Sequence, residues 1–215
     1  MVTARARLNQ LLAMAAERKW APLARDLAEL VLSWPADCPV QMRGPMLALF
    51  ETALREADAA ILGEIAPRFA GRSDVPLKVL NLLYLSAPAP LRREILLRNG
   101  LENEEMAAVH PADSLLILSA ARNGARDFAS AFAVGTGLTR RMAEAVLADR
   151  SGEALAVVCR STGLDRATFS ALVLLKAPRG TQLSAYDTVT PKAAAHLMQE
   201  WQKFAPLKPH AHAAE

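Results

Sequence analysis

Aromatic residues and cysteines are scarce in this sequence, and long apolar runs are missing. Phe, Trp and Tyr make up 5% of the 215 residues, and the cysteines are Cys38 and Cys159 alone. Two cysteines cannot form the disulfide framework of a small secreted domain, so we interpret both as small buried hydrophobic residues. The longest apolar stretches fall far short of the ~18 residues that a membrane-spanning helix needs. We therefore expect a soluble globular protein without a membrane partner.

The sequence also lacks an excess of charge of either sign. It has 25 basic and 22 acidic side chains, which gives a net charge of +3 at pH 7. Nucleic-acid-binding proteins usually carry a basic stripe or tail, and none is visible, so a nucleic-acid partner is not expected. Near the N-terminus, Arg5 and Arg7 precede an apolar segment as in a signal peptide, but Asn9 and Gln10 interrupt that segment. We interpret it as a first helix and expect a cytoplasmic protein.

Motifs that carry chemistry are missing as well. There is no Gly-x-Ser-x-Gly turn for a serine nucleophile, no phosphate-binding loop and no glycine-rich dinucleotide-binding turn. None of the histidines (His110, His196, His210 and His212) pairs with a carboxylate or a cysteine at the spacing of a helix face, which argues against a metal site. The sequence thus predicts no catalytic residue, no cofactor and no metal, and we do not expect an enzyme.

What the sequence has in abundance is helix-forming residues. Alanine, leucine and arginine are frequent, and the alternation of β-branched residues that is typical of strands is absent. The pattern therefore predicts an all-α fold. Apolar spacing, caps and breakers place helices over residues 3–19, 22–34, 41–57 or 45–57, 58–67, 77–85, 88–98, 102–109, 111–122, 126–134, 139–149, 152–161, 165–176 and 191–204.

A short motif at a helix–helix corner occurs twice. Thr136-Gly137-Leu138-Thr139-Arg140 is repeated 26 residues later as Thr162-Gly163-Leu164-Asp165-Arg166, and Asn99-Gly100-Leu101-Glu102 is a weaker third copy. In each copy the glycine is expected to end one helix in a left-handed conformation, the leucine to pack over the turn, and the next residue to cap the following helix.

Corners of this kind fold consecutive helices back on one another. We expect an irregular α-α superhelix of stacked helical hairpins, similar to HEAT-type repeats. In this interpretation residues 1–176 form the solenoid and residues 177–190 an irregular connection. Residues 191–205 form a C-terminal helix on the same domain, and residues 206–215 are a flexible tail.

With the helices placed, part of the sequence resembles a known family. The stretch Ala154-Leu155-Ala156-Val157-Val158-Cys159-Arg160-Ser161-Thr162-Gly163-Leu164, followed by Phe169, Ala171, Leu172 and Leu175, is similar to the C-terminal signature of an alphaproteobacterial helical-repeat family of unknown function, domain-of-unknown-function family 2336. The resemblance is best over residues 125–176 and rests on packing residues. It implies an α-α superhelix and a cytosolic bacterial protein, and it implies no catalytic residue.

A repeat architecture without a catalytic constellation favours a non-enzymatic module or adaptor that binds another protein. A tryptophan at a helix junction and two pairs of arginines near helix N-termini are the candidate contact residues: Trp20, Arg92, Arg93, Arg140 and Arg141.

Two alternatives remain open. The first is a DNA-binding regulator with a helix-turn-helix around Gly163, whose second helix would present Arg166, Thr168 and Ser170 to base edges. Burial of the apolar side chains of that helix and an internal ion pair of Arg166 would argue against it. The second is a small-molecule sensor with an apolar pocket between helices such as the one predicted at 77–85, which is apolar on almost all sides.

Overall fold

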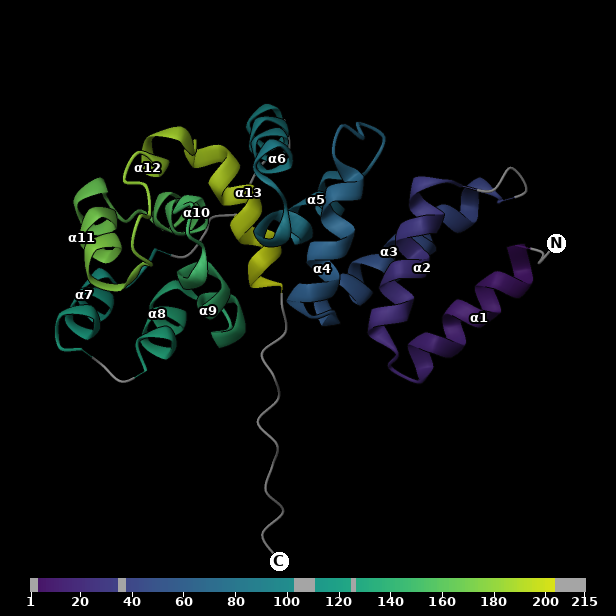
Figure 1. Ribbon diagram of the computed structural model, residues 1–215, viewed down its shortest axis with the longest axis horizontal. Helices are drawn as coiled ribbons and strands as arrows, with labels where there is room; N and C mark the ends of the chain where they lie inside the picture. Colours follow the sequence, from purple (N-terminus) through teal and green to yellow (C-terminus); the bar gives the residue numbers. More distant parts are fainter. Residues whose placement is uncertain (1–3, 35–37, 103–110, 125–126, 204–215) are drawn as a thin grey trace, which may run out of the picture. The chain divides into compact units, whose positions relative to one another are not determined.

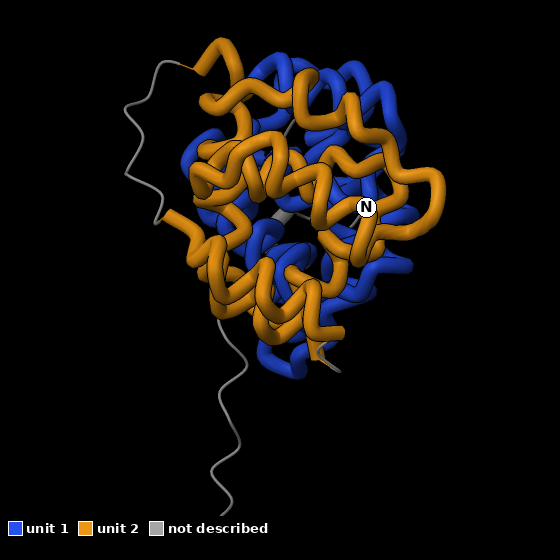
Figure 2. Tube along the Cα trace, turned by 90° about the vertical axis from the view of Figure 1, so that its left-hand side faces the viewer, with its two compact units in different colours: residues 1–98 blue, residues 99–215 orange. Residues whose placement is uncertain are grey.

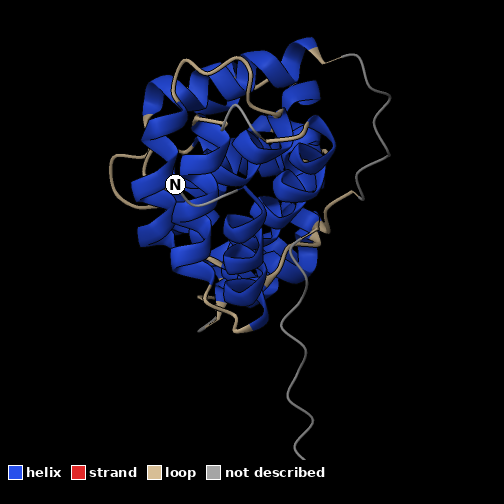
Figure 3. Ribbon diagram, turned by 90° about the vertical axis from the view of Figure 1, so that its right-hand side faces the viewer, coloured by secondary structure: helices blue, strands red, loops and turns tan. Residues whose placement is uncertain are grey.

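The computed structural model describes residues 4–34, 38–102, 111–124 and 127–203. Within these ranges every regular element is a helix and no strand occurs (Figure 3). The all-α prediction is therefore confirmed. The helix predicted at 102–109 and the tail predicted at 206–215 lie outside the described ranges, except for Glu102.

The chain divides into two compact units, Met1–Arg98 and Asn99–Glu215 (Figure 2). The boundary falls inside one helix, α6 (Ala89–Leu101). The single stack of hairpins predicted over residues 1–176 spans this boundary.

In the first unit, α-helices pack against other α-helices one or two places away in the sequence. α2 contacts α1, α3 and α4, and α3 contacts α5. Asp58 caps α4 by accepting a hydrogen bond from the Ile61 amide at 2.9 Å. The elements, labelled in Figure 1, are α1 (Ala4–Ala16), α2 (Trp20–Leu32), α3 (Val40–Glu56), α4 (Ala59–Ile65), the 3-10 helix η1 (Ala66–Phe69), α5 (Leu77–Leu83) and the 3-10 helix η2 (Tyr84–Ser86).

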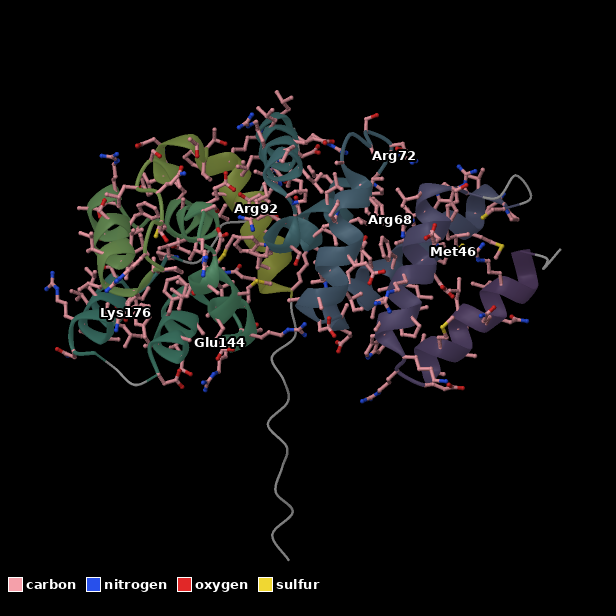
Figure 4. The ribbon with its side chains drawn as sticks, in the orientation of Figure 1. Met46, Arg68, Arg72, Arg92, Glu144 and Lys176 are labelled. Carbon is pink, nitrogen blue, oxygen red and sulfur yellow. The ribbon has the colours of Figure 1, made fainter. Side chains whose placement is uncertain are left out.

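Ion pairs join the surface of this unit, and α5 lies in its core. Every side chain of α5 from Val79 to Leu83 is buried, as expected for a helix that is apolar on almost all sides. At the surface, Arg68 pairs with Glu29 at 2.7 Å and Arg72 pairs with Asp74 at 2.8 Å (both arginines are labelled in Figure 4).

The second unit is organised around α10. All side chains from Ala154 to Cys159 are buried, and α10 contacts α9, α11, α12 and α13. Thr190 caps α13 by accepting a hydrogen bond from the Ala193 amide at 3.2 Å. The elements are α7 (Ser114–Arg122), α8 (Phe128–Thr136), α9 (Arg140–Ala148), α10 (Glu153–Ser161), α11 (Arg166–Lys176), α12 (Ala185–Thr188) and α13 (Pro191–Gln202).

The two predicted corners have the same geometry. Gly137 and Gly163 have positive φ angles of 69° and 80°, which a residue with a Cβ adopts only at a cost. The amide of Leu138 donates to the carbonyl of Ala133 at 3.0 Å, and that of Leu164 donates to Cys159 at 2.9 Å. These bonds close the end of the preceding helix as in a Schellman motif.

The threonine and the capping residue of each corner also have matching roles. The hydroxyls of Thr136 and Thr162 each donate to a carbonyl one turn back at 2.7 Å. Thr139 accepts from the Met142 amide at 3.2 Å, and Asp165 accepts from the Thr168 amide at 2.8 Å. The repeated motif is therefore a repeated local structure.

Two predictions about glycines are wrong. Residues 99–102 do not form a third corner, because α6 continues through Asn99 and Gly100 to Leu101. The helix predicted to stop at Gly135 continues to Thr136 and ends at Gly137. A glycine inside a helix costs only about 1 kcal/mol, so packing overrides it. At Gly135 that packing is identifiable, since an added Cβ would lie 2.6 Å from Cγ1 of Ile117.

Candidate functional site

Large apolar side chains are exposed on three helices of the second unit. Leu115 on α7 is 82% exposed, Val134 on α8 is 76% exposed, and Leu174 on α11 is 78% exposed. Leu116 and Leu175, next to two of these residues, are exposed as well. We call these five residues the apolar face. Single exposed leucines are common, whereas a group on packed neighbouring helices is a candidate contact surface.

The apolar face follows from how α7 is packed. Its fully covered side chains are Ile117 and Ala121, one turn apart on the side that faces α8 and α11. Leu115 and Ser119 project from the opposite side of the helix and are exposed. A nine-residue helix with four consecutive apolar residues, 115–118, cannot cover all of them against one neighbouring surface.

Backbone hydrogen bonds hold the start of α7 in place. The amide of Ala112 donates to the carbonyl of Thr162 at 3.0 Å, at the end of α10. The amide of Asp113 donates to Gly135 at 2.9 Å, near the end of α8. The Asp113 carboxylate then caps α7 by accepting from the Leu116 amide at 2.9 Å. The face is thus built on a helix tied to both repeated corners, not on a loop.

α7 and α11 run in the same direction. Ala112, just before α7, bonds to Thr162, just before α11, so the two helices start at the same end. At the other end, the ammonium of Lys176 lies 5.1 Å from the ring centroid of Phe128, which follows the loop after α7 (Lys176 is labelled in Figure 4). Their exposed leucines therefore lie on adjacent, parallel helices.

The helix-turn-helix alternative depends on the side chains after Gly163. The Arg166 guanidinium pairs with the Asp187 carboxylate of α12 at 2.8 Å. Tyr186, also on α12, donates its hydroxyl proton to the Leu164 carbonyl at 2.9 Å and stacks 4.3 Å under the Arg160 guanidinium. The short helix α12 thus holds the corner through Tyr186. Its Asp187 pairs with Arg166, the cation that would be needed to recognise a DNA base.

The rest of α11 does not resemble a recognition helix. Phe169 and Leu172 are buried, the Thr168 amide is used by the Asp165 cap, and the Ser170 hydroxyl donates to the Arg166 carbonyl at 2.8 Å. The outward side of the helix carries the exposed Leu174. From the sequence, two observations would argue against DNA binding. The first, an internal ion pair of Arg166, is met. The second, burial of the apolar side chains of this helix, is met in part, because Phe169, Leu172 and Val173 are buried whereas Leu174 and Leu175 are exposed.

The predicted contact residues do not form one group. Trp20 begins α2 in the first unit and is half-buried. In the same unit, Arg92 donates to the carbonyls of Leu85 and Ala87 at 2.7 and 3.0 Å, while Arg93 is exposed (Arg92 is labelled in Figure 4).

The second arginine pair lies in the other unit, at the start of α9. Arg140 pairs with Asp127 at 2.9 Å and with Glu144 at 2.8 Å, and Arg141 is exposed. Arg92 and Arg140 therefore serve bonds inside their own units. The apolar face was missed by sequence reasoning, although the run of four apolar residues in α7 was a usable signal.

Groups that carry chemistry are not brought together in the described parts of the chain. No three His, Cys, Asp or Glu side chains there are placed to hold a metal ion. Burial raises the pKa of the Cys159 thiol well above its usual range, so this thiol stays protonated. None of the described helices combines the length and apolarity that crossing a bilayer requires.

Comparison with known families bears on the same unit. Residues 109–204 match the model of a family described as "Uncharacterised protein conserved in bacteria (DUF2336)". The resemblance is confirmed over this segment. The DUF2336 segment is less than half of the chain, and it includes both repeated corners and all five residues of the apolar face. No curated protein and no solved structure matches the chain significantly.

Proposed function

We propose that this protein is a non-enzymatic, cytoplasmic interaction module that binds another protein through the apolar face of α7, α8 and α11. The observation that carries the proposal is the exposure of Leu115, Val134 and Leu174 on three packed helices. Apolar side chains at the centre of a contact supply much of the free energy of protein association. Hydrogen bonds at both corners fix α7, so little conformational entropy is lost when a partner binds.

The repeated corners support a superhelical arrangement within this module. The hairpins α8–α9 and α10–α11 are closed by the same hydrogen bonds, and α9 contacts α10 between them. Hairpins that repeat in this way stack as in HEAT-like proteins, whose surfaces commonly bind other proteins.

DNA binding through the corner at Gly163 has less support. It would require Arg166 to leave Asp187, and α11 would have to present Leu174 toward the phosphate backbone. A mobility-shift assay with genomic fragments at low salt checks this alternative, and we expect no salt-dependent shift. The small-molecule sensor with an apolar pocket stays a prediction.

Affinity capture with the tagged full-length chain from the native host tests the proposed function. Leu115→Gln removes the apolar surface but keeps the length of the side chain. Because Leu115 is exposed, this change should alter the free energy of unfolding by no more than about 0.5 kcal/mol. Val40→Gln is the matched control, since Val40 is 72% exposed on α3 of the first unit.

We expect proteins captured by the wild-type chain to be lost with Leu115→Gln and retained with Val40→Gln, as quantified by mass spectrometry. Equal recovery by all three chains would show that the apolar face does not make the contact.

A further inference from the structure

We propose that the partner of the apolar face is a second copy of this chain, which pairs α7 and α11 with the same helices antiparallel about a twofold axis. The inference rests on the proposed function, because it names the partner of that same surface. The distribution of charge around the apolar residues points to this pairing.

α7 and α11 each have an acidic start and a basic end. α7 begins at the exposed cap Asp113 and ends at the exposed Arg122. α11 begins at the exposed cap Asp165 and ends at Lys176, with the exposed Arg179 shortly after it. Because the two helices run in the same direction, the acidic caps lie at one end of the face and the basic side chains at the other.

Other charges near this face do not change the pattern. Arg166, beside Asp165, is neutralised by Asp187 at 2.8 Å. In the described parts of the chain, no ion pair involves Asp113 or Arg122, and the Asp113 carboxylate accepts the Leu116 amide of its own cap. Both charges that end α7 are therefore available to a partner.

With a twofold axis perpendicular to the helices, the charge distribution of one copy is complementary to that of the other copy. Rotation by 180° places the acidic end of each copy against the basic end of the other, and it aligns the helix dipoles antiparallel. A parallel pairing would bring like charges together. Between the charged ends the facing surfaces are apolar or small, with Leu115, Leu116 and Ser119 on α7 and Leu174 on α11.

The interface expected from two short helices is small. α7 has nine residues and α11 has eleven, so each contributes a contact of about 13 to 17 Å in length. Interfaces of this size are usually weak and concentration-dependent. We therefore expect a dimer in equilibrium with a monomer.

Sedimentation equilibrium of the full chain, from low micromolar to several hundred micromolar, measures the association. The wild-type mass should rise from monomer to dimer across the series. Leu115→Arg should weaken association at least about tenfold, since a charge is buried twice in a twofold interface. Val40→Arg, at a residue of matched exposure on the first unit, should leave it unchanged.

A charge cycle tests the antiparallel orientation. Arg122→Glu should weaken association, because the new carboxylate meets Asp113 of the other copy. Adding Asp113→Asn to the same chain removes that repulsion, while asparagine still caps α7. The double variant should thus associate more tightly than Arg122→Glu alone. Circular dichroism of each variant confirms that the helices are retained.

Several results would overturn the inference. They are a chain that stays monomeric at every concentration, a dimer that Leu115→Arg leaves intact, or a double variant no tighter than Arg122→Glu. If the chain stays monomeric and Leu115→Gln abolishes capture of a different protein, the inference that the partner is a second copy is wrong and the proposed function stands. If the chain stays monomeric and capture is unaffected by Leu115→Gln, both the dimer inference and the proposed function are wrong.

Discussion

Replacing Gly135 by alanine tests the packing that sets α7 against α8. A Cβ on residue 135 would lie 2.6 Å from Cγ1 and 2.9 Å from Cδ1 of the fully buried Ile117. Alanine inside a helix is favoured over glycine by about 0.5–1 kcal/mol. Overpacking a filled core costs about 1–3 kcal/mol. We therefore expect Gly135→Ala to lower the free energy of unfolding by up to about 2 kcal/mol.

The matched control is Gly63→Ala in α4, where an added Cβ meets no atom within 4 Å. This change should raise the free energy of unfolding by about 0.5–1 kcal/mol. Urea unfolding followed by circular dichroism measures both variants. In an Ile117→Ala background, Gly135→Ala should lose its destabilising effect because the clashing atoms are gone. A Gly135→Ala chain as stable as Gly63→Ala would refute the packing described here.

Three further predictions concern single side chains. Asp165→Ala should lower the free energy of unfolding by about 0.5–2 kcal/mol and Asp165→Asn by much less, because asparagine still accepts the Thr168 amide; urea unfolding measures both. The hydrogen bond from Arg72 lowers the pKa of Asp74 to about 2, so this pair stabilises the fold above about pH 4 and loses its effect as the pH falls through 2. Carboxyl NMR should show that pKa rising toward 3.8 in Arg72→Gln, and an unchanged value would contradict the pairing. Finally, Cys159 and Cys38 are buried, so thiol reagents at pH 8 should modify neither in the native chain and both in urea; rapid labelling of the native protein would contradict this.

Local signals in the sequence predicted most helix ends. Gly137 and Gly163 need a left-handed backbone, and Asp58, Thr139 and Asp165 accept amides three residues on. These features depend on a few consecutive residues, so the sequence alone was sufficient to place them. The same locality explains why both full copies of the corner proved to have one geometry.

Features that depend on distant residues were not predictable in this way. Gly135 resembles a helix end in the sequence, but its role is to admit Ile117, which is 18 positions earlier. The contact at the second corner joins Arg160 to Tyr186, which lies within the segment predicted to be irregular. Periodicity identified α7 as a helix but could not say which of its four consecutive apolar residues would remain exposed.

The charged candidates illustrate the same limit on local reasoning. Among the arginines predicted to contact a partner, Arg92 bonds to two backbone carbonyls and Arg140 to two carboxylates of its own unit. A guanidinium with several donors finds acceptors within reach in a packed fold. Only the folded chain distinguishes such internal bonds from free charge.

Site-specific photo-cross-linking in living cells of the native host tests the central claim most directly. A benzophenone amino acid replaces Leu115 in one chain and Val40 in another, and the covalent products are compared by mass. The apolar face, as described, predicts a discrete protein adduct from position 115 and none from position 40. No adduct at position 115, or the same adducts at both positions, would contradict the assignment of this face as the contact surface.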